Sequence, residues 1–192
     1  KETGFNPLML PDTYDNRAFL LELFQVLLTA NGEKITAQDI STINQVIEGN
    51  YRLPLKERRL RNVAAFFGIE GPDTLAGRLA QWHSDGNRAK LFDNENDIID
   101  FSSARVFGFE MGEILKDQVA LPPALLYLFH RINNSLNGTN TMIVLDEAWA
   151  LIDNPVFGSR IKNWLKVLRK LNAMVIFATQ SVEDASKSAI SD

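Results

Sequence analysis

"TMIVLDEAWALIDNP", residues 141–155, joins an apolar run directly to two carboxylates. The residues from Met142 to Leu145 are all apolar, and Asp146 and Glu147 follow at once. A buried charge is costly unless something pairs with it. The two carboxylates therefore lie at an exposed strand end or hold a cation, and the neighbouring sequence bears on that choice.

The sequence around this stretch alternates between strand and helix patterns. Strands are predicted at about Arg105–Phe109, at 141–145 and in "AMVIFATQS" (173–181), with helices at about Pro123–Leu136 and within 154–172. This alternation is typical of right-handed crossovers and a parallel sheet, in which apolar runs such as 141–145 are buried strands. The fold class is α/β. Ligands of such sheets bind beyond the carboxyl ends of the strands.

Three polar residues lie at these predicted carboxyl ends. A carboxylate there can hold Mg²⁺, usually through water, while a neighbouring one polarises the attacking water. In this Walker B interpretation Asp146 serves the metal and Glu147 is the catalytic base. Gln180, at the end of the next strand, senses a γ-phosphate or orients water. The alternative is an acidic turn and a strand end that are simply solvated.

A phosphate-binding loop is missing from the sequence. Such a loop needs G-x-x-x-x-G-K-[ST], and the chain contains no Gly-Lys pair. Either the loop precedes Lys1 in a longer protein, or the chain does not hydrolyse nucleotide. Because the sequence starts and stops in mid-pattern, we expect a fragment of a longer protein that binds ATP poorly by itself.

Residues 13–95 show helical patterning and predict an all-helical subdomain, followed by the sheet portion at 96–192. The first helix carries an apolar face in "NRAFLLELFQVLLTANG" (16–32). The second opens with Thr36 and Asp39 in capping-box spacing and closes at Gly49. A third runs from about Pro54 to Gly68, and a fourth has its N-cap at Asp73.

Composition excludes several function classes. The formal net charge is −4, so any nucleic-acid contact has to be local. The absence of cysteine excludes disulfides, thiolate zinc sites and a cysteine nucleophile. No apolar run approaches the roughly 20 residues that cross a bilayer. His83 and His130 lack metal-ligand spacing.

Two basic stretches each allow two interpretations. Lys162, Lys166, Arg169 and Lys170 form a stripe that is either a solvated helix face or a source of a trans-acting finger, Arg169 or Lys170, for a neighbouring subunit's ATP. "KERRLR" (56–61) is a solvated face or a patch for a partner or nucleic acid. Trp149 and Trp164 are expected to pack.

Several stretches together resemble a known family: "FNPLMLPDTYDNRAFL" (5–20), "LFDNENDIIDFSSARVFGFEM" (91–111), "PALLYLFHRI" (123–132), "ISD" (190–192) and, most specifically, residues 141–181. They resemble the VirB/TrbE/CagE class of type IV secretion ATPases. The resemblance implies part of a RecA-like P-loop NTPase motor domain of the HerA/FtsK superfamily, with an all-helical insertion at 13–95 and the Walker A loop outside residues 1–192. Asp146, Glu147 and Gln180 match the family's Walker B and glutamine motifs.

The same resemblance implies a setting. It implies ATP and Mg²⁺ as cofactors, other type IV secretion subunits as partners, and a homo-oligomer, a hexamer or a dimer of trimers, in the full-length protein. It also implies a place at the cytoplasmic side of the bacterial inner membrane, reached through other regions or partners, with DNA as a further partner. The alternatives are a DNA-translocating ATPase of the same superfamily and a non-catalytic scaffold.

Overall fold

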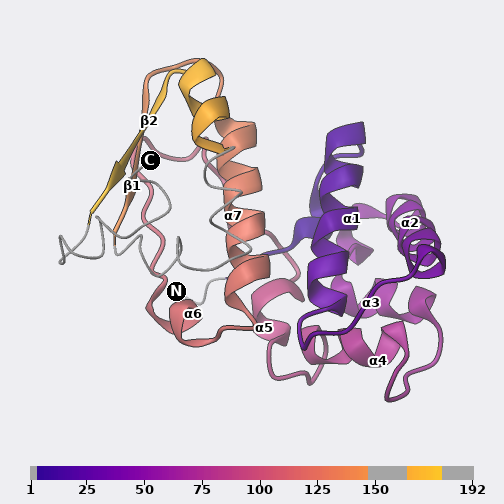
Figure 1. The fold of residues 1–192 in the computed structure, drawn as a ribbon. Helices are drawn as coiled ribbons and strands as arrows, with labels where there is room; N and C mark the ends of the chain where they lie inside the picture. The colour runs from indigo at the N-terminus through magenta and orange to yellow at the C-terminus, as the bar shows by residue number, and fades with distance from the viewer. Residues whose placement is uncertain (1–3, 147–163, 179–192) are drawn as a thin grey trace. The chain divides into compact units, whose positions relative to one another are not determined.

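The computed structural model describes residues 4–146 and 164–178. The chain divides into two compact units, residues 1–128 (the helical unit) and 129–192 (the sheet unit). The chain thus has the expected α/β character (Figure 1). The helices are α1 Tyr14–Leu28, α2 Ala37–Arg52, α3 Leu60–Ala64, α4 Leu75–Leu79, α5 Ala89–Phe92, α6 Gly112–Lys116 and α7 Leu121–Ser135, and the strands are β1 Thr141–Leu145 and β2 Ala173–Phe177.

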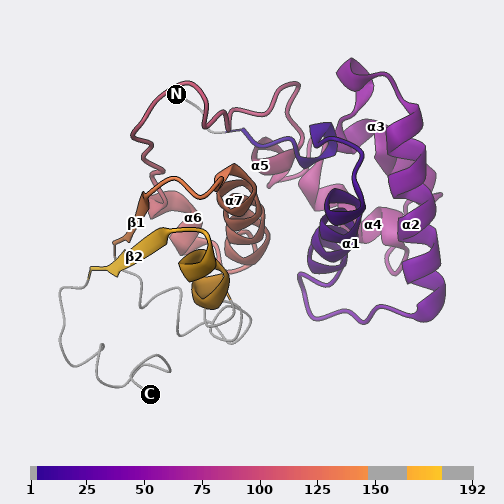
Figure 2. The ribbon, with the colours of Figure 1, turned by 90° about the horizontal axis from the view of Figure 1, so that it is seen from above.

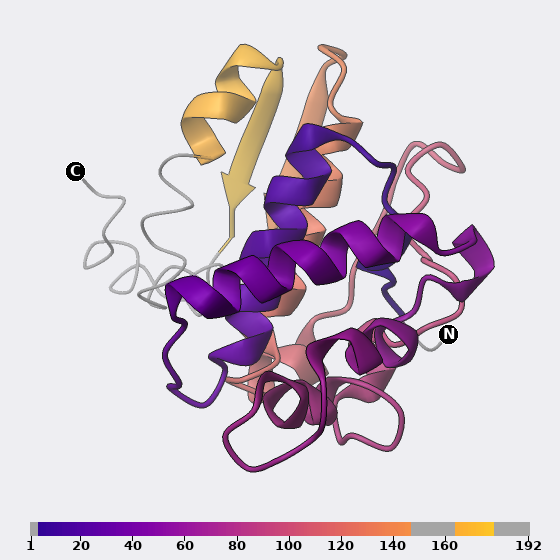
Figure 3. The ribbon, with the colours of Figure 1, turned by 90° about the vertical axis from the view of Figure 1, so that its right-hand side faces the viewer.

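Helices α1 and α2 form much of the helical unit's core, and α2 crosses α1 (Figure 3). The predicted apolar face of α1 is confirmed, with Phe19, Leu20, Leu23, Phe24, Leu27 and Leu28 all buried. The capping box of α2 is also confirmed. The Asp39 amide donates to the Thr36 hydroxyl over 3.2 Å, and the Thr36 amide donates to the Asp39 carboxylate over 2.8 Å. These bonds satisfy amides that a helix start leaves unpaired.

The predicted end of α2 at Gly49 is wrong, because the helix continues to Arg52. Gly49 serves packing instead of capping. A Cβ at this position would lie 3.0 Å from the Phe66 ring, so glycine is what lets that ring approach the helix. The helix ends at Arg52 because Leu53, the next residue, precedes Pro54. A residue before proline avoids helical geometry.

The predicted helix from Pro54 to Gly68 is broken in two. A 3-10 turn at Leu55–Glu57 is followed by two non-helical residues, Arg58 and Arg59, then by α3 and a second 3-10 turn at Ala65–Phe67. The break occurs because Arg58 turns back toward α2, donating to the carbonyls of Leu53 (3.1 Å) and Tyr51 (3.2 Å). Gly68 ends the segment as predicted, with φ +94°.

Helix α4 begins one residue later than predicted. Its N-cap is Thr74 and not Asp73, because the Thr74 hydroxyl accepts from the Gly77 amide over 3.1 Å. All of residues 13–95 are described, and their regular elements are α-helices and 3-10 turns. The extent of the insertion itself, 13–95, stays a prediction.

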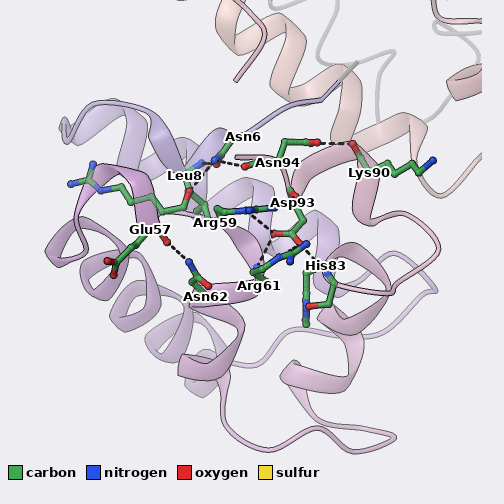
Figure 4. A network of polar contacts seen from close by, with 12 residues as sticks. Asn6, Leu8, Glu57, Arg59, Arg61, Asn62, His83, Lys90, Asp93 and Asn94 are labelled. Atoms are coloured by element: carbon green, nitrogen blue, oxygen red, sulfur yellow. Dashed lines mark hydrogen bonds and ion pairs between the residues drawn. The ribbon is translucent and has the colours of Figure 1, made fainter. Parts of the chain in front are cut away.

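A buried polar network joins distant parts of the helical unit (Figure 4). The Asp93 carboxylate is fully buried and accepts from the Arg61 guanidinium (2.8 Å), the Arg61 amide (3.1 Å) and the Ser84 amide (2.9 Å). Asn6, also fully buried, donates to the carbonyls of Arg58 (2.9 Å) and Asn94 (2.7 Å). The segment before α1 is thus part of this unit's core.

The predicted strand at Arg105–Phe109 is wrong. These residues are not in a strand, and within the described residues the sheet has only β1 and β2. A strand needs a neighbour to take up its backbone hydrogen bonds. Val106 is instead 87% exposed, and the nearby Phe101 ring contacts Phe107 and Phe109 locally.

The sheet unit confirms the predicted parallel pairing. β1 and β2 pair in parallel, from Thr141 beside Ala173 to Leu145 beside Phe177 (Figure 2). The predicted helix before β2 is confirmed for residues 164–170, and its earlier part lies outside the described residues. Trp164 packs as expected, with its ring 4.4 Å from that of Phe129.

The two strands are not buried on both faces as predicted. Four alternate side chains on one face are 40–60% exposed: Met142, Val144, Met174 and Ile176. The other face is half-buried. The alternation follows from the two-residue period of a strand whose two faces differ in how far the side chains are covered.

Candidate functional site at the carboxyl edge of the sheet

The carboxyl ends of β1 and β2 meet at one edge of the sheet. Leu145 pairs with Phe177, and the Ala178 amide donates to the Leu145 carbonyl over 2.9 Å. Asp146 follows Leu145 directly and is exposed. The structure therefore brings Asp146 next to the segment that leads to Gln180. Glu147 and Gln180 themselves lie outside the described residues.

Among the described residues of this site, Asp146 has a side chain that can bind a metal ion. A carboxylate supplies the hard oxygen ligand that Mg²⁺ prefers, and its place at a strand end leaves room for the water molecules that Mg²⁺ retains. In residues 4–146 and 164–178, no group of three or more His, Asp or Glu side chains is arranged to hold a metal ion. Asp146 could therefore supply one carboxylate ligand to a metal that phosphate and water also hold.

Arg169 lies at the opposite edge of the sheet from Asp146. It belongs to the helical residues 164–170, which end where β2 begins (Figure 1). Asn172 at this junction accepts from the Thr141 amide at the start of β1 over 3.2 Å. About 16 Å of strand separates that edge from Asp146. Arg169 and Lys170 are both exposed, and Arg169 is not brought to Asp146 within one chain.

Asn172 is a positioning residue that the sequence analysis missed. Its φ is +55°, a conformation that asparagine tolerates better than most residues. Its side-chain amide donates to the Gly138 carbonyl over 3.0 Å, and Gly138 also has a positive φ, +89°. Together these turns fix where both strands start, and the sequence signal was Asn137-Gly138 before the first apolar run and Asn172 before the second.

Arg131 is a cation near the end of α7 that the sequence analysis also missed. It is half-buried in the sheet unit, and this burial lowers its pKa from the usual value. Arginine keeps its charge in proteins even so. Its position within an otherwise apolar helical pattern concealed it.

The basic stretch at 56–61 is not the solvated face that the sequence favoured. Arg58 bonds to two backbone carbonyls, and Arg59 donates to the Asp93 carbonyl over 3.1 Å. Arg61 pairs with the Asp93 carboxylate. These arginines hold the helical unit together. Trp149 lies outside the described residues.

The two histidines have hydrogen-bond partners of their own. His83 is buried, and its Nδ1 lies 3.0 Å from the Ser84 hydroxyl. His130 Nε2 lies 3.0 Å from the Asn134 amide. No helix in the described parts of the chain is long and apolar enough to cross a membrane.

Comparison with known proteins defines the class. Residues 18–192 match the TraG P-loop domain, so the chain belongs to this family of P-loop proteins. Within it the chain is similar to the type IV secretion system protein VirB4 of Bartonella henselae, at 32% identity over 189 residues. It is also similar to the conjugal transfer protein TrbE of Rhizobium radiobacter (35% over 193 residues) and to VirB4 of Brucella abortus (33% over 190 residues). The VirB4/TrbE resemblance is thereby confirmed.

The match covers nearly all of this chain but little of its relatives. It takes in 98% of the chain and 24% of the Bartonella protein, and 100% of the chain and 23% of TrbE. The chain thus spans about a quarter of the length of these curated relatives, and it represents one portion of such a protein.

Proposed function

We propose that this chain is part of the ATPase motor of a bacterial type IV secretion or conjugation system. In the full-length protein, ATP hydrolysis would power pilus assembly and the transfer of DNA or protein. Membership of the TraG P-loop family supports a nucleotide-dependent protein. The observation that carries the proposal is the exposed carboxylate of Asp146, directly beyond β1 and beside the carboxyl end of β2.

The residues at this edge fit part of a Mg-ATP site. Bound Mg²⁺ neutralises charge on the phosphates during transfer. Asp146 would hold the metal, directly or through water, and Glu147 would accept a proton from the attacking water. Gln180, which follows β2 in the sequence, would orient that water. The phosphate-binding loop is not among these 192 residues, so the proposal concerns the full-length protein.

Arg169 is proposed to act on a neighbouring subunit. Its place at the edge opposite Asp146 separates it from the site of its own chain, while its exposure leaves it accessible. A homo-oligomer, such as a hexamer or a dimer of trimers, would let this arginine approach the ATP of the next subunit. An arginine supplied in trans contributes about 10³–10⁵-fold in related enzymes.

The setting is part of the proposal. The names of the relatives support other type IV secretion subunits as partners. We place the motor at the cytoplasmic side of the inner membrane, with contact to the bilayer made through other regions or partners. DNA-stimulated hydrolysis would favour the alternative of a DNA-translocating motor.

The first test separates binding from turnover in the full-length protein. Glu147→Gln keeps the shape of the side chain but removes the base, so ATP affinity should be retained while steady-state hydrolysis falls about 10²–10⁴-fold. Asp146→Asn should weaken Mg-ATP binding itself. Glu113→Gln, an exposed carboxylate of α6, is the matched control and should change neither quantity. Hydrolysis at the wild-type rate by Glu147→Gln would refute the assignment.

The second test examines Arg169. Arg169→Ala should slow hydrolysis without weakening ATP binding to an isolated subunit. Mixing it with Glu147→Gln should restore some activity, because an intact arginine of one subunit then meets an intact Glu147 in another. If mixed oligomers form without recovery, Arg169 is not a trans-acting residue and its stripe is a solvated face.

A further inference from the structure

Residues 100–116 form a long surface excursion of the helical unit. The chain leaves the core after Ile99, which is 5% exposed, and returns to it at Ala120, which is 7% exposed. Residues 102–108 between them are all exposed, and α6 is the regular element of the segment. We refer to residues 100–116 as the surface loop.

Aromatic side chains of the surface loop pack on one another. The Phe101 ring makes edge-on contacts with Phe107 and Phe109, at centroid distances of 5.1 and 6.1 Å. Compact loops that pack on their own side chains are often functional. The polar contacts that tie the loop to the rest of the helical unit lie at its two ends.

The first end of the surface loop is anchored by Tyr127. This side chain is fully buried, and its ring lies 5.3 Å from Phe5, 6.0 Å from Phe19 and 6.3 Å from Phe92. Its hydroxyl donates to the Asp97 carboxylate, three residues before the loop begins. This anchor belongs to the core and would persist if the other end opened.

The second end is held by a bidentate ion pair. The Arg88 guanidinium contacts both carboxylate oxygens of Asp117, at 2.7 and 3.0 Å. Asp117 also accepts from the amides of Val119 (3.0 Å) and Ala120 (3.1 Å), and its carbonyl accepts from the Leu121 amide (2.9 Å). One carboxylate thus closes the surface loop and caps the start of α7.

Arg88 is held in position by the helical body and not by the loop. Its guanidinium also donates to the Gln81 side chain over 2.8 Å and lies 5.8 Å from the Trp82 ring. Its backbone amide donates to the Gln81 carbonyl over 2.9 Å. The cation therefore remains in place whether or not Asp117 is bound to it.

We propose that Arg88 and Asp117 form a latch that controls local opening of the surface loop and the first turn of α7. When the latch is released, residues 100–121 open as one segment while α1 to α4 stay folded. Two features support local opening: the loop has its own aromatic packing, and Tyr127 secures the chain before it. The latch lies wholly within the helical unit, so its test does not depend on ATP hydrolysis.

The test is hydrogen exchange by peptide mass spectrometry on the full-length protein, with Arg88→Gln and Asp117→Ala. Arg88→Gln leaves the Asp117 cap intact and should raise exchange in 100–116 at least about ten-fold, as loss of charge-assisted bonds predicts. Asp117→Ala should also raise exchange at residues 119–121. The matched control is Glu113→Gln, which removes the exposed 2.7 Å pair with Lys116 in the same loop and should leave exchange unchanged.

Selective exchange in the surface loop and the first turn of α7 supports the latch. An unchanged loop in Arg88→Gln overturns the proposal. An equal rise in α1 and α2 also overturns it, because the ion pair would then stabilise the whole unit. A rise in Glu113→Gln as large as that in Arg88→Gln would do the same, since any lost loop charge would have that effect.

Discussion

The helical unit and the sheet unit differ in which side chains they bury and which they expose. The helical unit buries a charged carboxylate, Asp93, and surrounds it with donors, while its large core side chains such as Trp82 are fully covered. The sheet unit leaves apolar side chains such as Met142 and Val144 exposed on one face, and its candidate chemistry lies at one edge. The helical unit also exposes single apolar side chains such as Ile69, but on the sheet the exposed side chains share one face, so that face is open to further structure.

The largest expected effect tests how much the buried network around Asp93 stabilises the helical unit. Asp93→Ala removes the buried acceptor for the Arg61 guanidinium and for the backbone amides of Arg61 and Ser84. Hydrogen bonds to a charged group contribute about 1.5–3 kcal/mol each, and Asp93 accepts three of them. Exchange of α1 to α4 should therefore rise strongly, while amides of β1 and β2 keep their protection.

The control for this prediction is a surface pair in the same unit. Glu48 pairs with Arg52 on α2, with both side chains at least half exposed. Exposed pairs of this spacing contribute about 0.3–0.5 kcal/mol, so Glu48→Ala should barely change the free energy of unfolding. If Asp93→Ala costs no more than Glu48→Ala, the buried network does not stabilise the unit.

The next effect tests the open face of the sheet. Met174 is 53% exposed, so Met174→Gln in this chain should change the free energy of unfolding by under about 0.5 kcal/mol. In the full-length protein we expect this face to be covered, and the same substitution should cost about 1.5–3 kcal/mol. Val106→Gln, at a loop position that is 87% exposed, is the control and should be neutral in both. Equal costs of Met174→Gln in the two proteins would show that the face stays open.

The sequence predicted elements whose signals are local and unambiguous. The apolar period of α1, the capping box at Thr36 and the pairing of β1 with β2 all follow from spacing within one segment or from the order of segments. The edge of the sheet at which Asp146 lies follows from the same order. The roles of Asp146, Glu147, Gln180 and Arg169 stay predictions.

The errors arose where one residue type has two uses. Glycine ends a helix at Gly68 through a positive φ, but at Gly49 it makes room for the Phe66 ring within a helix. Arg58 belongs to a charged run that favours a solvated helix, yet it turns back to the carbonyls of α2. These uses depend on tertiary partners that no local pattern contains. The apolar alternation at 105–109 likewise predicts a strand, but it does not show whether another strand lies alongside to accept and donate its backbone hydrogen bonds.

The smallest expected effect is a pH dependence of the latch in the helical unit. The hydrogen bonds from Arg88 hold the pKa of Asp117 below its ordinary value of 3.8. The stabilisation is therefore fully present above that value and is lost as the pH falls through the lower pKa of the folded state. Because Asp117 is one-third exposed, solvent screening should keep this contribution under about 1 kcal/mol.

Other carboxylates titrate in the same range, so the measurement has to be a difference. The pKa of Asp39 is lowered by hydrogen bonds from Thr36, and that of Asp12 by its bond to Arg17. Urea unfolding of the wild type and of Asp117→Asn, compared between pH 6 and pH 3, cancels these shared contributions. The wild type should be the more stable at pH 6, and the gap should narrow as the pH falls below 3.8, because the unfolded state then takes up a proton on Asp117 that the folded state, with its lowered pKa, takes up only at lower pH. A difference in the free energy of unfolding that stays constant over this range would show that the charge of Asp117 does not contribute to the attachment of the surface loop. Its hydrogen bonds alone would then hold the start of α7.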